Sequence, residues 1–113
     1  MLRSKRRLNK AFFERKFSSK WNQLDSRLFS FKFGKFSPDE TRFACVVSKK
    51  EANLAVKRNK IRRQFYGILS EIYPRVRPGF CGIFFLKKEG VVADSLVLRR
   101  EIENFLKKAA ILD

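Results

Sequence analysis

Apolar residues alternate with polar ones in several short segments, which is typical of β-strands with one buried face. In residues 27–33 three phenylalanines occupy alternate positions, so they are predicted to point inward while Lys32 belongs to the opposite side. Residues 41–48 form a second strand-like segment, and a possible short edge strand lies near residues 20–23. Residues 80–87 are apolar enough for a strand that is covered on both faces.

Other segments repeat apolar residues at helical spacing. Residues 6–17 predict a short helix, and a second helix is predicted to begin within residues 52–57. The apolar residues of this second helix recur at i, i+4, i+7, i+8 and i+11, which puts them on one face. They are Ile61, Phe65, Ile68, Leu69 and Ile72. A last amphipathic helix is predicted to start near Asp94 or Ser95, after a loop at residues 89–93.

The predicted element order is α-β-β-β-α-β-α. It indicates one α+β domain over residues 1–113, a small two-layer sandwich in which helices pack on a sheet. A chain of 113 residues is long enough to bury a modest core. Cys45 and Cys81 lie in strand-like segments and are expected to be buried and reduced. Because the sequence has no histidine, a zinc site is not expected.

The charge of the chain is strongly unbalanced. It has 27 Lys and Arg against 11 Asp and Glu, a net charge of +16 at pH 7. Such self-repulsion favours a polyanionic partner, with nucleic acid first and an anionic membrane surface second. A hydrophobic content of 44% excludes a disordered basic tail. No apolar run approaches the roughly 18 residues that span a bilayer, and no signal peptide is evident, so we expect a cytoplasmic protein.

The basic residues are densest on the second predicted helix. With Ile61 at the centre of the apolar stripe, a rotation of about 100° per residue defines an opposite, polar side. That side carries Asn59, Arg62, Arg63 and Tyr66, and Lys60 lies on its flank. Lys57 and Arg58 lie nearer the apolar stripe, but at the N-terminal end, where the helix can project past the core. Residues 57–66 contain no acid, whereas a solvated face normally mixes both signs. Arginine suits phosphate because its planar fork donates two parallel hydrogen bonds. A nucleic-acid contact is therefore favoured over a merely solvated face.

The order of residues in this region resembles a known signature. Ser48, Lys49 and Lys50 end a strand, and a helix follows with Ala55, Val56, Arg58, Asn59, Lys60, Ile61, Arg62 and Arg63. This order resembles the bacterial ribonuclease P protein subunit, and the resemblance covers most of the chain. Two departures stand out. Lys60 replaces the third residue of an Arg-Asn-Arg triplet, and the linker at residues 51–54 is one residue longer than usual and lacks glycine.

The resemblance implies an accessory subunit of a ribonucleoprotein endoribonuclease. Such a subunit binds the catalytic RNA and the 5′ leader of precursor tRNA, and it assists removal of the leader by phosphodiester hydrolysis. The RNA holds most of the Mg²⁺, and no catalytic residue or metal ligand is expected in the protein. In keeping with this, a Ser/His/Asp set is impossible without histidine, and the carboxylates are scattered. The family also implies a left-handed βαβ crossover, although about 98% of crossovers are right-handed.

The predicted catalytic-RNA contacts are Lys49, Lys50, Lys57, Arg58, Asn59, Lys60, Arg62, Arg63 and Tyr66. For the leader, two aromatic faces on the helix at residues 6–17 need two partners, one of which is the core. The other partner is predicted to be single-stranded RNA, because bases stack on aromatic rings. The resemblance implies a cleft between this helix and the sheet. The predicted leader contacts are Phe13, Phe17, Lys10, Lys16 and Lys32.

Several alternatives remain open. Phe13 and Phe17 could both pack into the core, and Trp21 could either stack on a base or cap the core. The charged residues Arg99, Arg100, Lys107 and Lys108 are interpreted as a solvated helix face. Another structured-RNA-binding protein of the ribosomal type is the alternative function. DNA is not expected as a partner, because no helix-turn-helix spacing or zinc ligands are evident, and the oligomeric state is left open.

Overall fold

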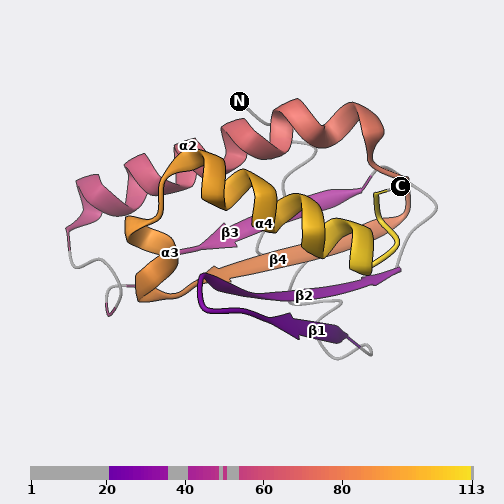
Figure 1. The fold of residues 1–113 in the computed structure, drawn as a ribbon, viewed down its shortest axis with the longest axis horizontal. Helices are drawn as coiled ribbons and strands as arrows, with labels where there is room; N and C mark the ends of the chain where they lie inside the picture. Colours follow the sequence, from indigo (N-terminus) through magenta and orange to yellow (C-terminus); the bar gives the residue numbers. More distant parts are fainter. Residues whose placement is uncertain (1–20, 36–40, 49, 51–53, 113) are drawn as a thin grey trace.

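The structure is a computed structural model, and it describes residues 21–35, 41–48, 50 and 54–112. Four strands form one sheet in the order β1-β2-β4-β3 (Figure 1). They are β1 (Asn22–Asp25), β2 (Phe29–Lys35), β3 (Arg42–Val46) and β4 (Phe80–Leu86). Strand β2 pairs antiparallel with both β1 and β4, while β3 runs parallel to β4. The last strand along the chain is therefore central in the sheet.

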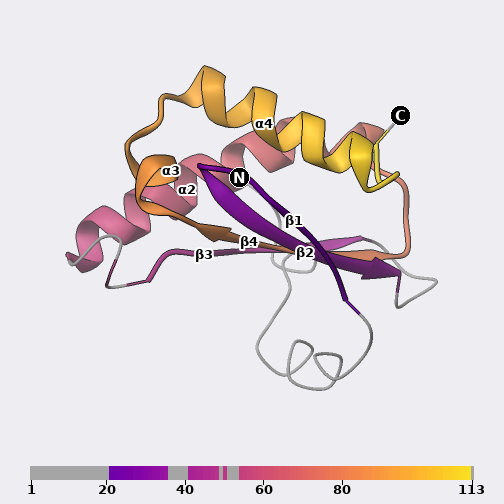
Figure 2. The ribbon, with the colours of Figure 1, turned by 60° about the horizontal axis from the view of Figure 1, so that its bottom comes forward.

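The described helices cover one face of this sheet. They are α2 (Ala55–Ile72), the short 3₁₀ helix η2 (Tyr73–Arg75), α3 (Lys88–Val92) and α4 (Ser95–Lys108). Figure 2 shows α2 and α4 together on the same side of the strands. The predicted α+β class with helices layered on a small sheet is confirmed.

The connection from β3 through α2 to β4 joins two parallel neighbours. In Figure 1 both strands run toward the left and α2 lies in front of them, with β4 below β3. With the strands turned to point upward, the chain therefore moves from β3 to a strand on its left. This is the left-handed crossover that the resemblance implied, and it is opposite to the usual sense.

Aromatic rings fill the space between the sheet and the helices. The ring of Phe84, in the middle of β4, has four aromatic neighbours from three other elements. Its centroid lies 4.3 Å from Phe31, 4.9 Å from Phe65, 5.2 Å from Phe29 and 6.2 Å from Phe43. Aromatic pairs at such distances add to the apolar area that each ring buries. The inward direction predicted for the phenylalanines of residues 27–33 is confirmed.

All five stripe residues of α2, from Ile61 to Ile72, are buried as predicted. Helix α4 begins where predicted, because the Asp94 carboxylate accepts a hydrogen bond from the Val97 amide at 3.0 Å. The loop predicted at residues 89–93 is wrong, since α3 spans Lys88–Val92.

Helix α3 was not predicted, because it is stabilised by a tertiary contact and its sequence has no helical pattern of apolar residues. A side chain at Gly90 would collide with the Leu28 carbonyl oxygen. The backbone of α3 therefore lies directly against the residue that precedes β2. The Lys87 amide also donates to that carbonyl oxygen at 2.9 Å. Only glycine lets the α3 backbone come so close to the Leu28 carbonyl group. In the sequence, a glycine in so short a segment favours the prediction of a loop.

Candidate nucleic-acid interface

Helix α2 is fixed on the sheet by its buried stripe, which leaves its basic residues on the other sides. Of the predicted RNA contacts, five are exposed: Lys50, Lys57, Asn59, Lys60 and Arg63. Arg58, Arg62 and Tyr66 are half-buried, and Lys49 lies outside the described residues. The first turn of α2 carries no acidic residue, and its N-cap Leu54 has no side-chain oxygen to accept from the first amides. Positive charge and helix-end amides therefore meet at the same end of α2.

One flank of α2 faces the edge strand β3. The Cys45 amide donates to the Tyr66 hydroxyl oxygen at 3.1 Å, so Tyr66 ties the helix to the sheet. The Arg62 guanidinium donates to the Asn59 side-chain oxygen. Burial raises the pKa of the Cys45 thiol, and the positive charge of Arg62 opposes that shift. Arg62 and Asn59 are thus oriented together, one turn apart on this flank.

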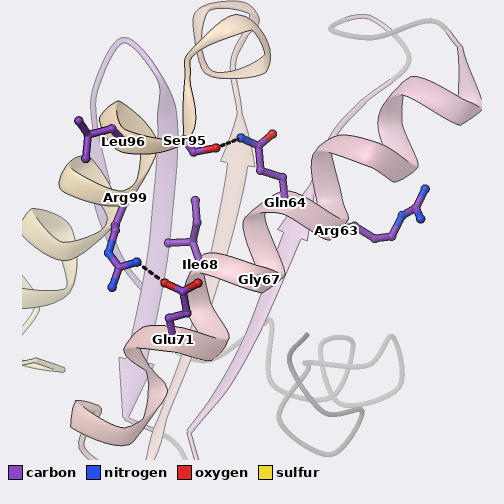
Figure 3. Close-up of a pocket in the computed structure, with 8 residues that line it drawn as sticks. All are labelled: Arg63, Gln64, Gly67, Ile68, Glu71, Ser95, Leu96 and Arg99. Atoms are coloured by element: carbon purple, nitrogen blue, oxygen red, sulfur yellow. Dashed lines mark hydrogen bonds and ion pairs between the residues drawn. The ribbon is translucent and has the colours of Figure 1, made fainter.

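The opposite flank of α2 forms a groove with α4, shown in Figure 3. We refer to it as the α2–α4 groove. It is lined by Arg63, Gln64, Gly67, Ile68, Glu71, Ser95, Leu96 and Arg99. The Gln64 amide nitrogen donates to the Ser95 hydroxyl oxygen at 2.6 Å. Sequence reasoning missed this groove, because its residues come from two helices some thirty positions apart.

Arg99 lines the groove and makes two ion pairs. Its guanidinium forms an ion pair with Glu71 of α2 and a second one, at 3.3 Å, with Glu103. The hydrogen bonds with Glu71 and Glu103 raise the pKa of Arg99. Arg99 is thus a partly exposed residue with ion-pair partners, whereas Arg100, Lys107 and Lys108 are exposed as expected.

The sheet face turned away from α2 and α4 carries a second, smaller apolar cluster. Cys81 and Ile83 are buried there, and Trp21, Ala44 and Phe85 pack against them. The Lys32 ammonium lies 5.6 Å from the centroid of the Phe85 ring, a cation–π geometry. Lys32 is on the side that the alternation predicted. The other predicted leader contacts, which are Phe13, Phe17, Lys10 and Lys16, lie outside the described residues.

The described residues contain no group of three or more His, Cys, Asp or Glu side chains arranged to hold a metal ion. None of their helices combines the length and the apolar character that a membrane crossing requires.

A small sheet that holds a helix rich in Arg and Lys, with no acid within residues 57–66, defines a basic α+β domain. The chain matches the model of the Ribonuclease P family over residues 1–110. It therefore belongs to the ribonuclease P protein family. The resemblance read from the Ser-Lys-Lys and Arg-Asn-Lys residues is confirmed.

Individual relatives agree with this assignment. The ribonuclease P protein component of Synechococcus elongatus is 37% identical over 78 residues, which cover 67% of this chain and 63% of the relative. The chain thus spans less than two thirds of that relative's length. The RNase P protein from Thermotoga maritima is 26% identical with a TM-score of 0.75, over 90% of this chain and 96% of that one. The Staphylococcus aureus RNase P protein shares the fold, with a TM-score of 0.79 at 22% identity over 96% and 98% of the two chains.

Proposed function

We propose that this chain is the protein subunit of ribonuclease P. It binds the catalytic RNA and the 5′ leader of precursor tRNA, and it assists the endonucleolytic cut that produces the mature tRNA 5′ end. The observation that carries the proposal is the basic face of α2, held outward by five buried apolar side chains in a chain of this family. The protein contributes binding, and the RNA subunit performs the phosphodiester hydrolysis.

The catalytic RNA docks on the basic face of α2. Arg58, Arg62 and Arg63 bind phosphates, because a guanidinium matches two phosphate oxygens at once. Asn59 orients Arg62 by accepting its hydrogen bond. Lys50, Lys57 and Lys60 add exposed charge around these arginines. Tyr66 acts mainly by fixing α2 to β3 through the Cys45 amide.

The 5′ leader follows the sheet face that carries Lys32 and Phe85. The half-buried Phe85 ring supplies a surface for a base, and Lys32 beside it supplies a charge for the backbone. Stacking on an aromatic ring contributes about 1–3 kcal/mol per base and tolerates any sequence. Phe13, Phe17, Lys10 and Lys16 complete the leader contacts in this proposal.

The Mg²⁺ of the reaction is held mainly by the RNA. A two-metal site needs clustered carboxylates, and the 11 acidic residues of this chain are scattered among 27 basic ones. The reaction takes place in the cytoplasm, where precursor tRNA is made.

A cleavage assay tests the proposal. Labelled precursor tRNA is incubated with a ribonuclease P RNA transcript from the same genome at low Mg²⁺, with and without the protein. We expect the protein to restore release of the 5′ leader and to release nothing without the RNA. Failure of a folded protein to rescue cleavage would instead favour another structured RNA as the partner.

A further inference from the structure

A glycine in the middle of α2 has no packing reason to be there. Gly67 lies five residues before the end of an 18-residue helix, where glycine costs about 1 kcal/mol relative to alanine. Beyond its chain neighbours and the backbone of its own helix, a Cβ atom at this position would meet nothing within 4 Å, and the backbone is not in the left-handed region. Gly82 and Gly90, by contrast, have neighbours that a Cβ would strike. The missing side chain at Gly67 therefore leaves open space and nothing else.

That open space belongs to the α2–α4 groove. The groove has a volume of about 450 Å³, within the range of about 300–1,000 Å³ that small-ligand sites occupy. Ile68 and Gly67 line an apolar part of its wall. Such a surface accepts a planar ring, because no side chain projects from position 67.

The polar residues of the groove retain hydrogen-bonding capacity. Gln64 uses one amide hydrogen on Ser95, which leaves its carbonyl oxygen as an acceptor and its second amide hydrogen as a donor. The Ser95 hydroxyl accepts that bond and keeps its own hydrogen to donate. Donors and an acceptor within one small area match the edge of a nucleobase, which presents both kinds of group.

The charges around the groove favour an anionic chain. Arg63 stands on the rim and points away from α4 toward solvent, as Figure 3 shows. Glu71, the acid in the groove lining, is neutralised by its ion pair with Arg99. Lys60 lies one turn before Gln64 on the same flank of α2. A phosphate bound at Arg63 would place its attached sugar and base next to Gly67.

We propose that the α2–α4 groove accepts one unpaired nucleobase of the RNA that binds the basic face of α2. Gln64 and Ser95 contact the base edge, the backbone at Gly67 contacts its face, and Arg63 holds an adjoining phosphate. The inference rests on the proposed function and adds a base-reading site to it. The RNA strand thus crosses α2 from the β3 flank to the α4 flank.

Filling the groove is the first test. We compare the wild-type protein with Gly67→Ala and Gly67→Leu, and we use Asn104→Leu as a control for an added apolar side chain on an exposed helix position outside the groove lining. Binding to the ribonuclease P RNA transcript is measured at one salt concentration after circular dichroism has verified folding. Gly67→Leu is expected to weaken binding about tenfold, equivalent to the loss of one or two hydrogen bonds. Gly67→Ala is expected to weaken binding less than Gly67→Leu, because its side chain fills less of the groove. Asn104→Leu is expected to bind within about twofold of wild type, under the net contribution of one hydrogen bond. Equal binding by all four proteins would overturn the inference.

Site-directed crosslinking is the second test, and it does not depend on the folding of Gly67→Leu. Ser95→Cys is labelled with a short thiol-reactive photo-crosslinker, and Asn104→Cys is the control. The native thiols do not compete, because Cys45 and Cys81 are only 5% and 1% exposed. We expect Ser95→Cys to crosslink to one or a few adjacent unpaired nucleotides, and Asn104→Cys to crosslink weakly and diffusely.

Crosslinks from position 95 to base-paired RNA, to a second copy of the protein or to nothing would contradict the groove site. A different result would show that the proposed function is wrong. In that case the wild-type protein itself would neither bind the transcript nor stimulate leader release, whatever residue stands at position 67.

Discussion

Replacing Arg58, Arg62 and Arg63 together by alanine is predicted to weaken binding to the ribonuclease P RNA and to make it less sensitive to salt. The fold should survive, because the buried apolar residues from Ile61 to Ile72 hold α2 on the sheet. Alanine also has a higher helix propensity than arginine. A change in RNA binding would therefore report lost contacts and not lost structure.

The size of the effect follows from counterion release. Each phosphate contact contributes about 0.7–0.9 to the slope of log K against log salt, with single strands at the low end. If each of the three arginines binds one phosphate, the slope becomes shallower by about 2.1–2.7. Between 50 and 200 mM salt the wild-type affinity should then fall about 20- to 40-fold more than the affinity of the variant.

The assay is an equilibrium titration of labelled RNA at four or more salt concentrations. The matched control replaces three exposed residues of α4, Arg100, Lys107 and Lys108, by alanine. This control variant loses the same net charge as the α2 variant. If the control flattens the slope as much as the α2 variant does, net charge alone governs binding. Parallel slopes for the α2 variant and the wild type would refute the assignment of phosphate contacts to α2.

Four further predictions concern stability and reactivity. Tyr66→Phe should lower the free energy of unfolding in urea by about 1–3 kcal/mol, because the Cys45 amide loses its acceptor; an unchanged midpoint would contradict this. Phe84→Ala should cost about 3–5 kcal/mol in the same measurement, since it empties the site on which four other rings converge. Gly67→Ala should raise the free energy of unfolding by up to about 1 kcal/mol, seen as a higher melting temperature, because its Cβ enters open space; a lower one would mean that the backbone there is strained. Cys45 and Cys81 should react with a thiol reagent at pH 8 only after denaturant is added, since both are buried and burial raises the pKa of Cys45; rapid labelling of the folded protein would show that the strands open.

The parts of this molecule that sequence predicted are those where one local signal suffices. The stripe from Ile61 to Ile72 has a helical period, and it faces the sheet as a single surface. Asp94 precedes a helical pattern and caps it. The exposed basic face of α2 was predicted in the same way, because it is the complement of the buried stripe. The resemblance to a family then supplied the crossover hand, which no periodicity encodes.

The parts that sequence missed depend on contacts between distant segments. Helix α3 exists where Gly90 meets the Leu28 backbone, and neither residue signals the other in sequence. The ion pair between Arg99 of α4 and Glu71 of α2 could not be predicted, because these residues are far apart in the sequence and meet only when the two helices pack. The groove has the same origin, since Gln64 and Ser95 are 31 positions apart. Pairings of this kind are decided by helix packing, which residue patterns along one helix do not describe.

The position of β4 in the sheet has a consequence for synthesis on the ribosome. Its partners β2 and β3 are made earlier, yet each of them pairs with β4 and not with the other. A nascent chain that ends before Phe80 therefore lacks β4, the strand that pairs with both β2 and β3. It also lacks Phe84, whose ring contacts four other aromatic rings of the core. At about 5–20 residues per second, the basic residues of α2 emerge seconds before the surface that will hold them. Most of the stability of a helix in a protein comes from tertiary packing of its apolar face, so α2 (Ala55–Ile72) and its basic face take shape only after the strand that follows it in the chain has been made.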